Sequence, residues 1–226
     1  MEDLLTDQQK AEKVKSWVRQ NGLSIVAGLG LGIGGLFGWN QWQGYSERQA
    51  EEASALYETF MQSVRASQLE QAESGLAALA ADYGSSPYMD QGRLAMARLY
   101  LDQGKPEPAA EMLRKVVSTT ALPEIRHIAR LRLARVLLYQ EKYDEALKTL
   151  ADPGSDAFSP AFHDVRGDVY YAMGKLAEAR SEYEQALNSD ISARLIERNY
   201  VQAKLDDLGS DAADLTAPNV ESTPDP

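Results

Sequence analysis

The chain has 226 residues, of which 25% are charged and 44% hydrophobic, a composition typical of a folded protein with one or two domains. Asp and Glu number 34 against 23 Lys and Arg, and the resulting net charge of −11 disfavours binding to nucleic acid through a broad surface. The lack of cysteine excludes disulfides and thiolate chemistry, and two histidines, His127 and His163, are too few for a metal site built from several imidazoles.

An uncharged stretch near the amino terminus predicts a transmembrane helix at residues 21–43. Its length matches the roughly 20 residues needed to cross a bilayer core, and Trp39 and Trp42 fall at its end, where indole rings favour the membrane interface. The basic residues that precede it are Lys10, Lys13, Lys15 and Arg19. Because cytoplasmic flanks are enriched in Lys and Arg, we expect residues 1–20 in the cytoplasm and the remainder across the membrane.

Three other interpretations of this stretch stay open. A cleaved signal peptide has a shorter apolar core with a small-residue site directly after it, whereas Trp39 and Trp42 occupy that place here. Residues 30–35 match the G-x-G-x-x-G dinucleotide fingerprint, but that motif requires an alternating β/α context that the following sequence does not predict. The third is a buried helix of a soluble protein. The transmembrane helix accounts best for the length, the missing charge and the basic flank together.

Small residues recur along one side of the predicted transmembrane helix. Gly28, Gly32 and Gly35 are spaced by four and three residues, so they share a helix face that a second transmembrane helix can approach closely. Glycine is also common in membrane helices in general. A lateral partner and a chance spacing are equally compatible with this pattern.

Residues 44–208 predict an all-α fold of repeated helical hairpins, punctuated by Pro and Gly and without the alternation of a β-strand. A small residue recurs at one position in three hairpins, separated by 37 and then 33 residues: Ala109, Ala146 and Ala179. Twelve residues earlier stands another small residue in each: Ala97, Ala134 and Gly167. Small residues let paired helices approach closely, and the pattern matches a tetratricopeptide (TPR)-like solenoid with repeats of about 34 residues.

Both ends of the repeat array have their own signals. A more divergent first hairpin is predicted around Ala72 and Phe60, which occupy the corresponding positions. Residues 192–208 predict a capping helix that covers the last hairpin with its apolar side chains. The following residues, 209–226, contain few apolar side chains, so we expect them to form a disordered acidic tail.

No group of residues predicts catalysis, and we expect a non-enzymatic protein that needs no cofactor or metal. The neighbours His163 and Asp164 begin a helix of the last hairpin, where capping or packing is the ordinary role. Four arginines between residues 126 and 135 form a basic cluster. Arg132 is expected on a different helix face from the other three, which favours separate salt bridges over an anion site.

The first helices of successive hairpins are expected to form a concave surface. The repeat alignment predicts which side chains face it, and apolar and aromatic groups flanked by both charge signs suit a peptide or protein partner. The candidate partner-binding residues are Leu94, Arg98, Leu101, Leu131, Arg135, Leu138, Tyr139, Asp168 and Tyr171.

The order of these segments resembles the YfgM family, described as ancillary subunits of the SecYEG translocon. The resemblance lies in the acidic Glu2 and Asp3, the basic run through Arg19, the glycine-rich stretch ending at Trp39, and the hairpins downstream. It implies a single-span protein of the bacterial inner membrane with a periplasmic helical domain. The partners it implies, besides inner-membrane lipid, are the SecYEG translocon, a PpiD-like membrane-anchored chaperone, unfolded exported proteins and an Rcs-type response regulator.

The segments predict a membrane-anchored interaction protein, and the resemblance implies that it assists the Sec translocon and passes newly translocated proteins to periplasmic chaperones. Anchoring beside the exit site raises the effective concentration of the domain, so that weak contacts suffice. Two alternatives stay open: an adaptor for assembling another envelope complex, and a stress-signalling regulator acting through residues 1–20.

Overall fold

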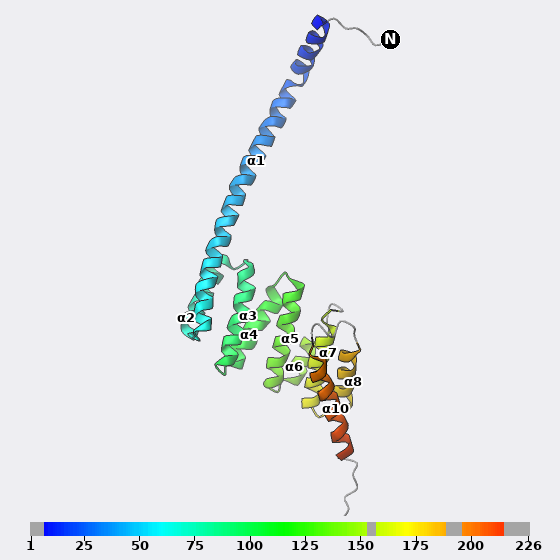
Figure 1. Ribbon diagram of the computed structural model, residues 1–226. Coiled ribbons are helices and arrows are strands. Elements are labelled where there is room, and N and C mark those ends of the chain that lie inside the picture. The colour runs from blue at the N-terminus through cyan, green and yellow to red at the C-terminus, as the bar shows by residue number, and fades with distance from the viewer. Residues whose placement is uncertain (1–6, 153–156, 189–195, 215–226) are drawn as a thin grey trace, which may run out of the picture. The chain divides into compact units, whose positions relative to one another are not determined.

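The computed structural model describes residues 7–152, 157–188 and 196–214, and every regular element within these ranges is a helix. The helices are α1 Asp7–Arg65, α2 Leu69–Tyr83, α3 Pro87–Asp102, α4 Pro106–Thr119, α5 Pro123–Tyr139, α6 Tyr143–Thr149, α7 Ser159–Ala172, α8 Leu176–Leu187 and α10 Arg198–Asp214 (Figure 1). The all-α prediction is confirmed. The chain divides into two units, Met1–Ser54 and Ala55–Pro226, which we describe separately.

The first unit contains the amino-terminal part of α1, whose apolar side chains are largely exposed. Among the described residues no single straight helix is both long and apolar enough to span a membrane; the segments Lys10–Ser24 and Val26–Arg65, which meet at 45°, meet that requirement only together. The uncharged stretch extends across this bend, so neither segment contains all of it. The span at residues 21–43 and its orientation therefore stay predictions.

The predicted glycine face is fully accessible in this unit. A Cβ atom added at Gly28, Gly32 or Gly35 would meet nothing within 4 Å apart from the adjoining backbone of its own helix. The helix thus has room for a close neighbour along this face. Packing against a second transmembrane helix stays a prediction.

In the part of the second unit that the structure describes, four helical hairpins follow one another. Residues 55–65 of α1 pair with α2, where Phe60 contacts Gly75, and the following pairs are α3 with α4, α5 with α6, and α7 with α8. Each hairpin also packs on the next: α2 contacts α3, α4 contacts α5, and both α5 and α6 contact α7 (Figure 1). This is the predicted TPR-like arrangement, including its divergent first hairpin.

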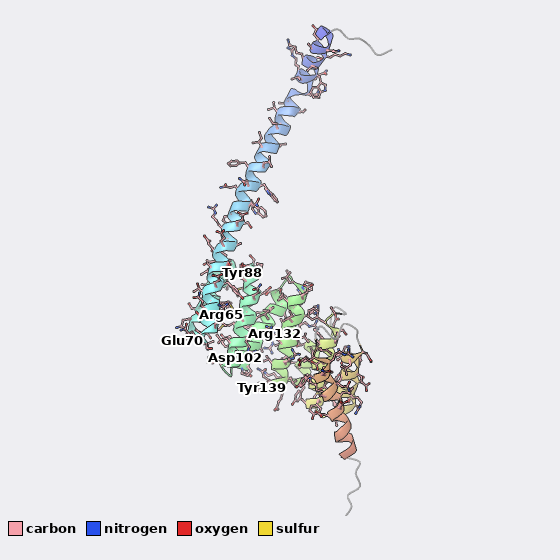
Figure 2. The ribbon with its side chains drawn as sticks, in the orientation of Figure 1. Arg65, Glu70, Tyr88, Asp102, Arg132 and Tyr139 are labelled. Atoms are coloured by element: carbon pink, nitrogen blue, oxygen red, sulfur yellow. The ribbon has the colours of Figure 1, made fainter. Side chains whose placement is uncertain are left out.

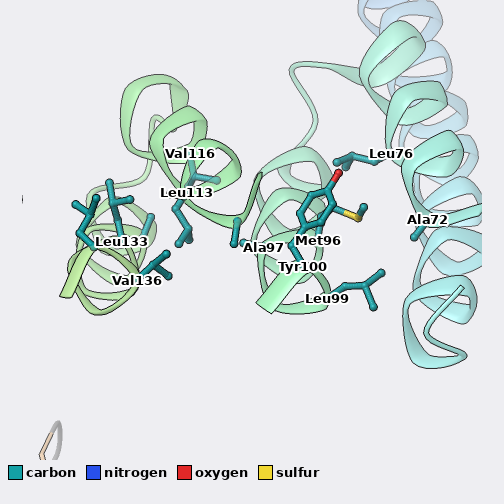
Figure 3. Packing of buried hydrophobic residues seen from close by; sticks show 14 of the residues in the cluster. Ala72, Leu76, Met96, Ala97, Leu99, Tyr100, Leu113, Val116, Leu133 and Val136 are labelled. Carbon is teal, nitrogen blue, oxygen red and sulfur yellow. The ribbon is translucent and has the colours of Figure 1, made fainter. Parts of the chain in front are cut away.

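The repeat positions predicted from the sequence are buried in every hairpin. The alanines are Ala72, Ala109, Ala146 and Ala179, each with no exposed surface. The residues twelve positions earlier are likewise buried: Phe60, Ala97, Ala134 and Gly167. Figure 3 shows the result in the middle of the unit, where Leu113 of α4 lies between Ala97 of α3 and Val136 of α5.

Gly167 of α7 leaves no room for a side chain against α8. A Cβ atom at this position would lie 2.3 Å from Cε1 of Tyr183, so only glycine leaves space for the aromatic ring. Tyr183 is itself buried, and its hydroxyl donates a hydrogen bond to Asp168 at 2.9 Å. The small residue on α7 and the large residue on α8 are therefore complementary.

All four hairpins turn with the same backbone geometry. Five residues before each buried alanine is a residue with positive φ: Ser67 (56°), Gly104 (69°), Glu141 (58°) and Gly174 (74°). The amide of each donates to the carbonyl three residues earlier, and the next amide donates to the carbonyl five residues before itself. This is the Schellman closure of a helix carboxyl end, repeated four times.

Replacing Glu141 by Gly is expected to stabilise the fold by about 0.5–1 kcal/mol. A non-glycine residue in the left-handed region costs roughly 1–2 kcal/mol, and the greater freedom of glycine in the unfolded chain offsets part of the gain. Gly174→Ala should have the opposite effect; since an added Cβ there meets nothing within 4 Å, the cost is purely conformational. Urea unfolding followed by circular dichroism measures both changes. A lower midpoint for Glu141→Gly would contradict this account.

Helix α10 covers the end of the last hairpin. Val201 and Leu208 are buried in one cluster with Ala179 and Tyr183, which confirms the capping helix. Its first predicted residues, 192–195, lie outside the described residues.

The helix ends later than predicted. The boundary of the expected tail at residue 209 is wrong, because α10 continues to Asp214. Ala212 and Ala213 favour helix, and the first proline after them is Pro218. Residues 215–226 of the expected tail lie outside the described residues.

Candidate protein-binding groove

A groove of about 560 Å³ lies between α3 and α5, the first helices of two adjacent hairpins. Pro106 and Leu113 of α4 close it from beneath. The residues that line it are Leu94, Ala97, Arg98, Leu101, Gly104, Pro106, Leu113, Arg132, Arg135, Val136 and Tyr139. The groove thus combines a mainly aliphatic wall with three guanidinium groups.

Part of the apolar lining is open to solvent. Leu101 is 38% exposed and Tyr139 is 77% exposed, and Tyr139 lies at the carboxyl end of α5 (Figure 2). Single exposed apolar side chains are ordinary on a protein surface, but several of them gathered in one groove mark a binding site. The groove therefore offers apolar contact area that the fold itself does not use.

The three arginines of the groove differ in their partners. Arg98 Nε lies 2.8 Å from Asp102 Oδ1, but both side chains are well exposed, so this ion pair is weak. Arg135 Nη2 lies 3.9 Å from Asp164 Oδ2. Arg132 makes no ion pair with any carboxylate of the described residues. Its guanidinium is available to an anionic group of a ligand.

The placement of Arg132 corrects the sequence prediction. Arg132 and Arg135 are three residues apart on α5, so they share a face and both line the groove. Arg126 and Arg130 instead donate to backbone carbonyl groups outside it. The four arginines therefore form two pairs, and Arg132 belongs to the pair on the concave side.

A second groove of about 450 Å³ adjoins the first and shares Arg135 with it. Lys204 of α10 reaches into it and donates to Asp164 at 2.8 Å and to Asp168. Burial raises the pKa of Asp168 even though Lys204 opposes the shift. Burial lowers the pKa of Lys204, but its hydrogen bonds to Asp164 and Asp168 outweigh this and raise it. Asp168 is therefore already engaged by the capping helix.

Most of the nine predicted partner-binding residues line one of these grooves. Those in the first groove are Leu94, Arg98, Leu101, Arg135 and Tyr139, and those in the second include Leu138 and Asp168. Their binding to a partner stays a prediction.

Leu131 and Tyr171 are placed differently. Leu131 is only 7% exposed and packs with Leu150 and Phe162, so its assignment to the concave surface was wrong. Helix α7 of the next hairpin covers Leu131. The spacing of apolar residues in α5 alone does not predict this contact. Tyr171 is exposed but lines neither groove.

The two histidines take part in packing networks. His163 Nδ1 lies 2.7 Å from Glu182, and Arg166 Nε donates to the same carboxylate at 2.9 Å. Burial raises the pKa of Glu182, but these hydrogen bonds outweigh it and leave the pKa below its usual value. The ring of His127 packs against Phe158, with ring centroids 5.0 Å apart. Within the described ranges no cluster of His, Asp and Glu is arranged to hold a metal ion.

Comparison with known proteins agrees with this architecture. Residues 15–210 match the family model of the tetratricopeptide repeat-like domain. A crystal structure of a putative kinesin light chain from Podosopora anserina, with nearly identical TPR-like repeats, has a TM-score of 0.54 at 20% identity, over 73% of this chain and 89% of that chain. At this identity the likeness concerns the fold alone.

Two relatives resemble the chain over almost their whole length, and both are named ancillary SecYEG translocon subunit. The protein from Escherichia coli K12 is 28% identical over 92% of this chain and 99% of its own length. The protein from Neisseria gonorrhoeae is 31% identical over 90% of this chain and 98% of its own length. The chain therefore belongs to the family of ancillary SecYEG translocon subunits with a tetratricopeptide repeat-like domain, the YfgM family.

Proposed function

We propose that this protein is a membrane-anchored, non-enzymatic accessory subunit of the Sec translocon that binds polypeptides through its helical domain. The observation that carries the proposal is the extent of the likeness, which covers 98–99% of the ancillary SecYEG translocon subunits and extends beyond the repeats. On this proposal residues 1–20 are cytoplasmic, residues 21–43 span the inner membrane and the hairpins lie in the periplasm.

The groove between α3 and α5 is the proposed polypeptide-binding site. An unfolded exported segment exposes apolar side chains, and Leu94, Leu101 and Tyr139 offer them apolar contacts. Arg132 supplies a charge-assisted hydrogen bond to an Asp, a Glu or a terminal carboxylate. The combination suits short apolar segments that carry an acidic group.

The proposed partners follow from the position of the groove on the periplasmic side of the membrane. Unfolded exported proteins occupy the groove, and a PpiD-like membrane-anchored chaperone receives them next. Anchoring keeps the domain close to the exit site, so individually weak groove contacts produce frequent capture. A weak contact also releases its ligand quickly, as a transfer step requires.

Site-specific crosslinking in cells tests the proposal. A photoreactive amino acid at Tyr139 is expected to crosslink to translocon subunits or to exported chains. The matched control is Gln185, an exposed residue of α8 that lines neither groove, and its crosslinks should be several-fold weaker. Crosslinks from Tyr139 to a different envelope complex would favour the adaptor alternative. Equal crosslinking from both positions would exclude the groove as the binding site.

A further inference from the structure

The segment Lys10–Ser24 is set apart from the rest of α1. It meets the following segment, Val26–Arg65, at 45°. The bend falls shortly after the change in composition: Lys10, Lys13, Lys15 and Arg19 precede it, and most of the uncharged stretch follows it. The two parts of the helix therefore differ in direction and in chemistry.

The segment has a narrow apolar face. Val14, Trp17 and Val18 are 62%, 58% and 48% exposed. At about 100° per residue these three side chains fall within an arc of about 100°. No side chain of the described residues covers them.

Lys13 and Lys15 border this apolar face on its two sides, and Lys10 continues the line of the face one turn before Val14. On the same helical projection Lys13 lies about 40° beyond Trp17, and Lys15 lies about 60° beyond Val18. Arg19 lies almost opposite the apolar face. A bilayer surface matches this pattern, since lysine stems extend along the acyl boundary while the ammonium groups reach the phosphates.

We infer that residues 10–20 of this segment form an interfacial helix that lies against an anionic bilayer surface. Val14, Trp17 and Val18 enter the boundary between headgroups and acyl chains, where indole rings are favoured. Lys13 and Lys15 contact lipid phosphates from either side of them. The basic segment thus binds lipid and, in addition, determines the orientation of the chain in the membrane.

The inference rests on the proposed membrane anchor, because the bilayer must be held next to the segment. The predicted span at residues 21–43 begins two residues after Arg19, which places the apolar face within reach of the same leaflet. A soluble partner protein is the less suitable occupant, since a face three residues wide buries too little surface for stable docking between proteins. The lysines on both borders instead complement a continuous negative surface.

Tryptophan fluorescence of the full-length protein in vesicles tests the inference. The chain contains three tryptophans, so W39F/W42F leaves Trp17 as the only probe. In vesicles with phosphatidylglycerol, the emission maximum of Trp17 should shift to shorter wavelength than in the protein unfolded by denaturant without vesicles. The quenching of Trp17 by acrylamide should be several-fold weaker than in that unfolded protein. Lipids brominated near the headgroup should quench Trp17 more than lipids brominated near the chain ends.

Charge reversal tests the contribution of the lysines. K13E/K15E in the W39F/W42F background should restore acrylamide quenching in anionic vesicles. The matched control K105E/K142E changes the net charge equally at two exposed lysines of the hairpins and should leave Trp17 protected. Protection that is the same in neutral phosphatidylcholine vesicles, or that survives K13E/K15E, would overturn the role of anionic lipid.

A second variant distinguishes failure of this inference from failure of the proposed membrane anchor. W17F retains Trp39 and Trp42 at the end of the predicted span and reports on the anchor alone. Trp17 accessible to acrylamide while Trp39 and Trp42 are protected would overturn the interfacial helix and leave the anchor intact. Trp17 quenched best by deeply placed bromine would make the segment part of the span. If all three tryptophans are accessible, the membrane anchor itself is refuted.

Discussion

Gly167→Ala is expected to lower the free energy of unfolding by about 3 kcal/mol, at the upper end of the usual cost of an added methyl group in a packed core. The new Cβ would lie 2.3 Å from Cε1 and 2.5 Å from Cδ1 of Tyr183. The ring cannot move away easily, because it is buried and its hydroxyl is bonded to Asp168. Helices α7 and α8 must therefore separate, which also disturbs the capping helix. Urea unfolding of the detergent-solubilised protein measures the loss.

A second glycine provides the matched control. Gly209 lies in α10, and a Cβ atom there would meet only Arg180 Nη2, at 3.9 Å. Gly209→Ala should therefore be neutral or stabilise the protein by up to about 1 kcal/mol, the difference in helix propensity between the two residues. Similar unfolding midpoints for the two variants would show that the contact with Tyr183 does not determine the residue at position 167.

Lys204→Met is expected to cost about 2–3 kcal/mol at neutral pH, because it leaves Asp168 without a cation and Asp164 with only the 3.9 Å contact to Arg135. Removing one partner of a buried ion pair typically costs about 3–5 kcal/mol, and the remaining exposure of these side chains reduces this figure. The side chains of Lys204, Asp164 and Asp168 are 17%, 10% and 25% exposed. Lys142→Met is the control: Lys142 and Glu107 are well exposed and 3.9 Å apart. Its loss should stay below about 0.5 kcal/mol.

The loss in Lys204→Met should depend on pH in a defined direction. Burial already raises the pKa of Asp168 above its usual value of 3.8, and without Lys204 the pKa rises further. A carboxyl group with a higher pKa in the folded chain binds its proton more tightly there, so it destabilises the fold as the pH rises through that pKa. The deficit should shrink as the pH falls from 7 toward the raised pKa. Adding Asp168→Asn should recover part of the stability at pH 7, and a deficit independent of pH would contradict the ion-pair account.

The sequence was most informative where a structural feature depends on residues within one hairpin. The distance between two paired helices depends on the size of the residues between them, so Ala109, Ala146 and Ala179 predicted the buried contacts correctly. The first hairpin could be predicted from Ala72 for the same reason. The turn at Glu141 could not, because no residue type that favours positive φ marks it.

Features that depend on neighbouring hairpins were harder to predict. Leu131 occupies the repeat position of Leu94, yet Leu131 is buried against α7 of the next hairpin, whereas Leu94 lines the groove beside α5 of its own next hairpin. Arg132 was missed as a groove residue, although its three-residue spacing from Arg135 was a usable signal. The engagement of Asp168 by Lys204 joins residues 36 positions apart, and no local pattern predicts such a contact.

The shared closure of the four turns bears on how such a chain can arise. Main-chain hydrogen bonds complete each turn, with Ser67, Gly104, Glu141 or Gly174 at the left-handed position. Few particular side chains are needed for the chain to reverse direction in such a unit. Its amino-acid sequence can therefore change extensively after tandem duplication. Changes of length then accumulate in the connectors between units, as the 37- and 33-residue separations illustrate. An ancestral hairpin could thus be duplicated repeatedly, and the surface residues of each copy could change while every copy kept its turn.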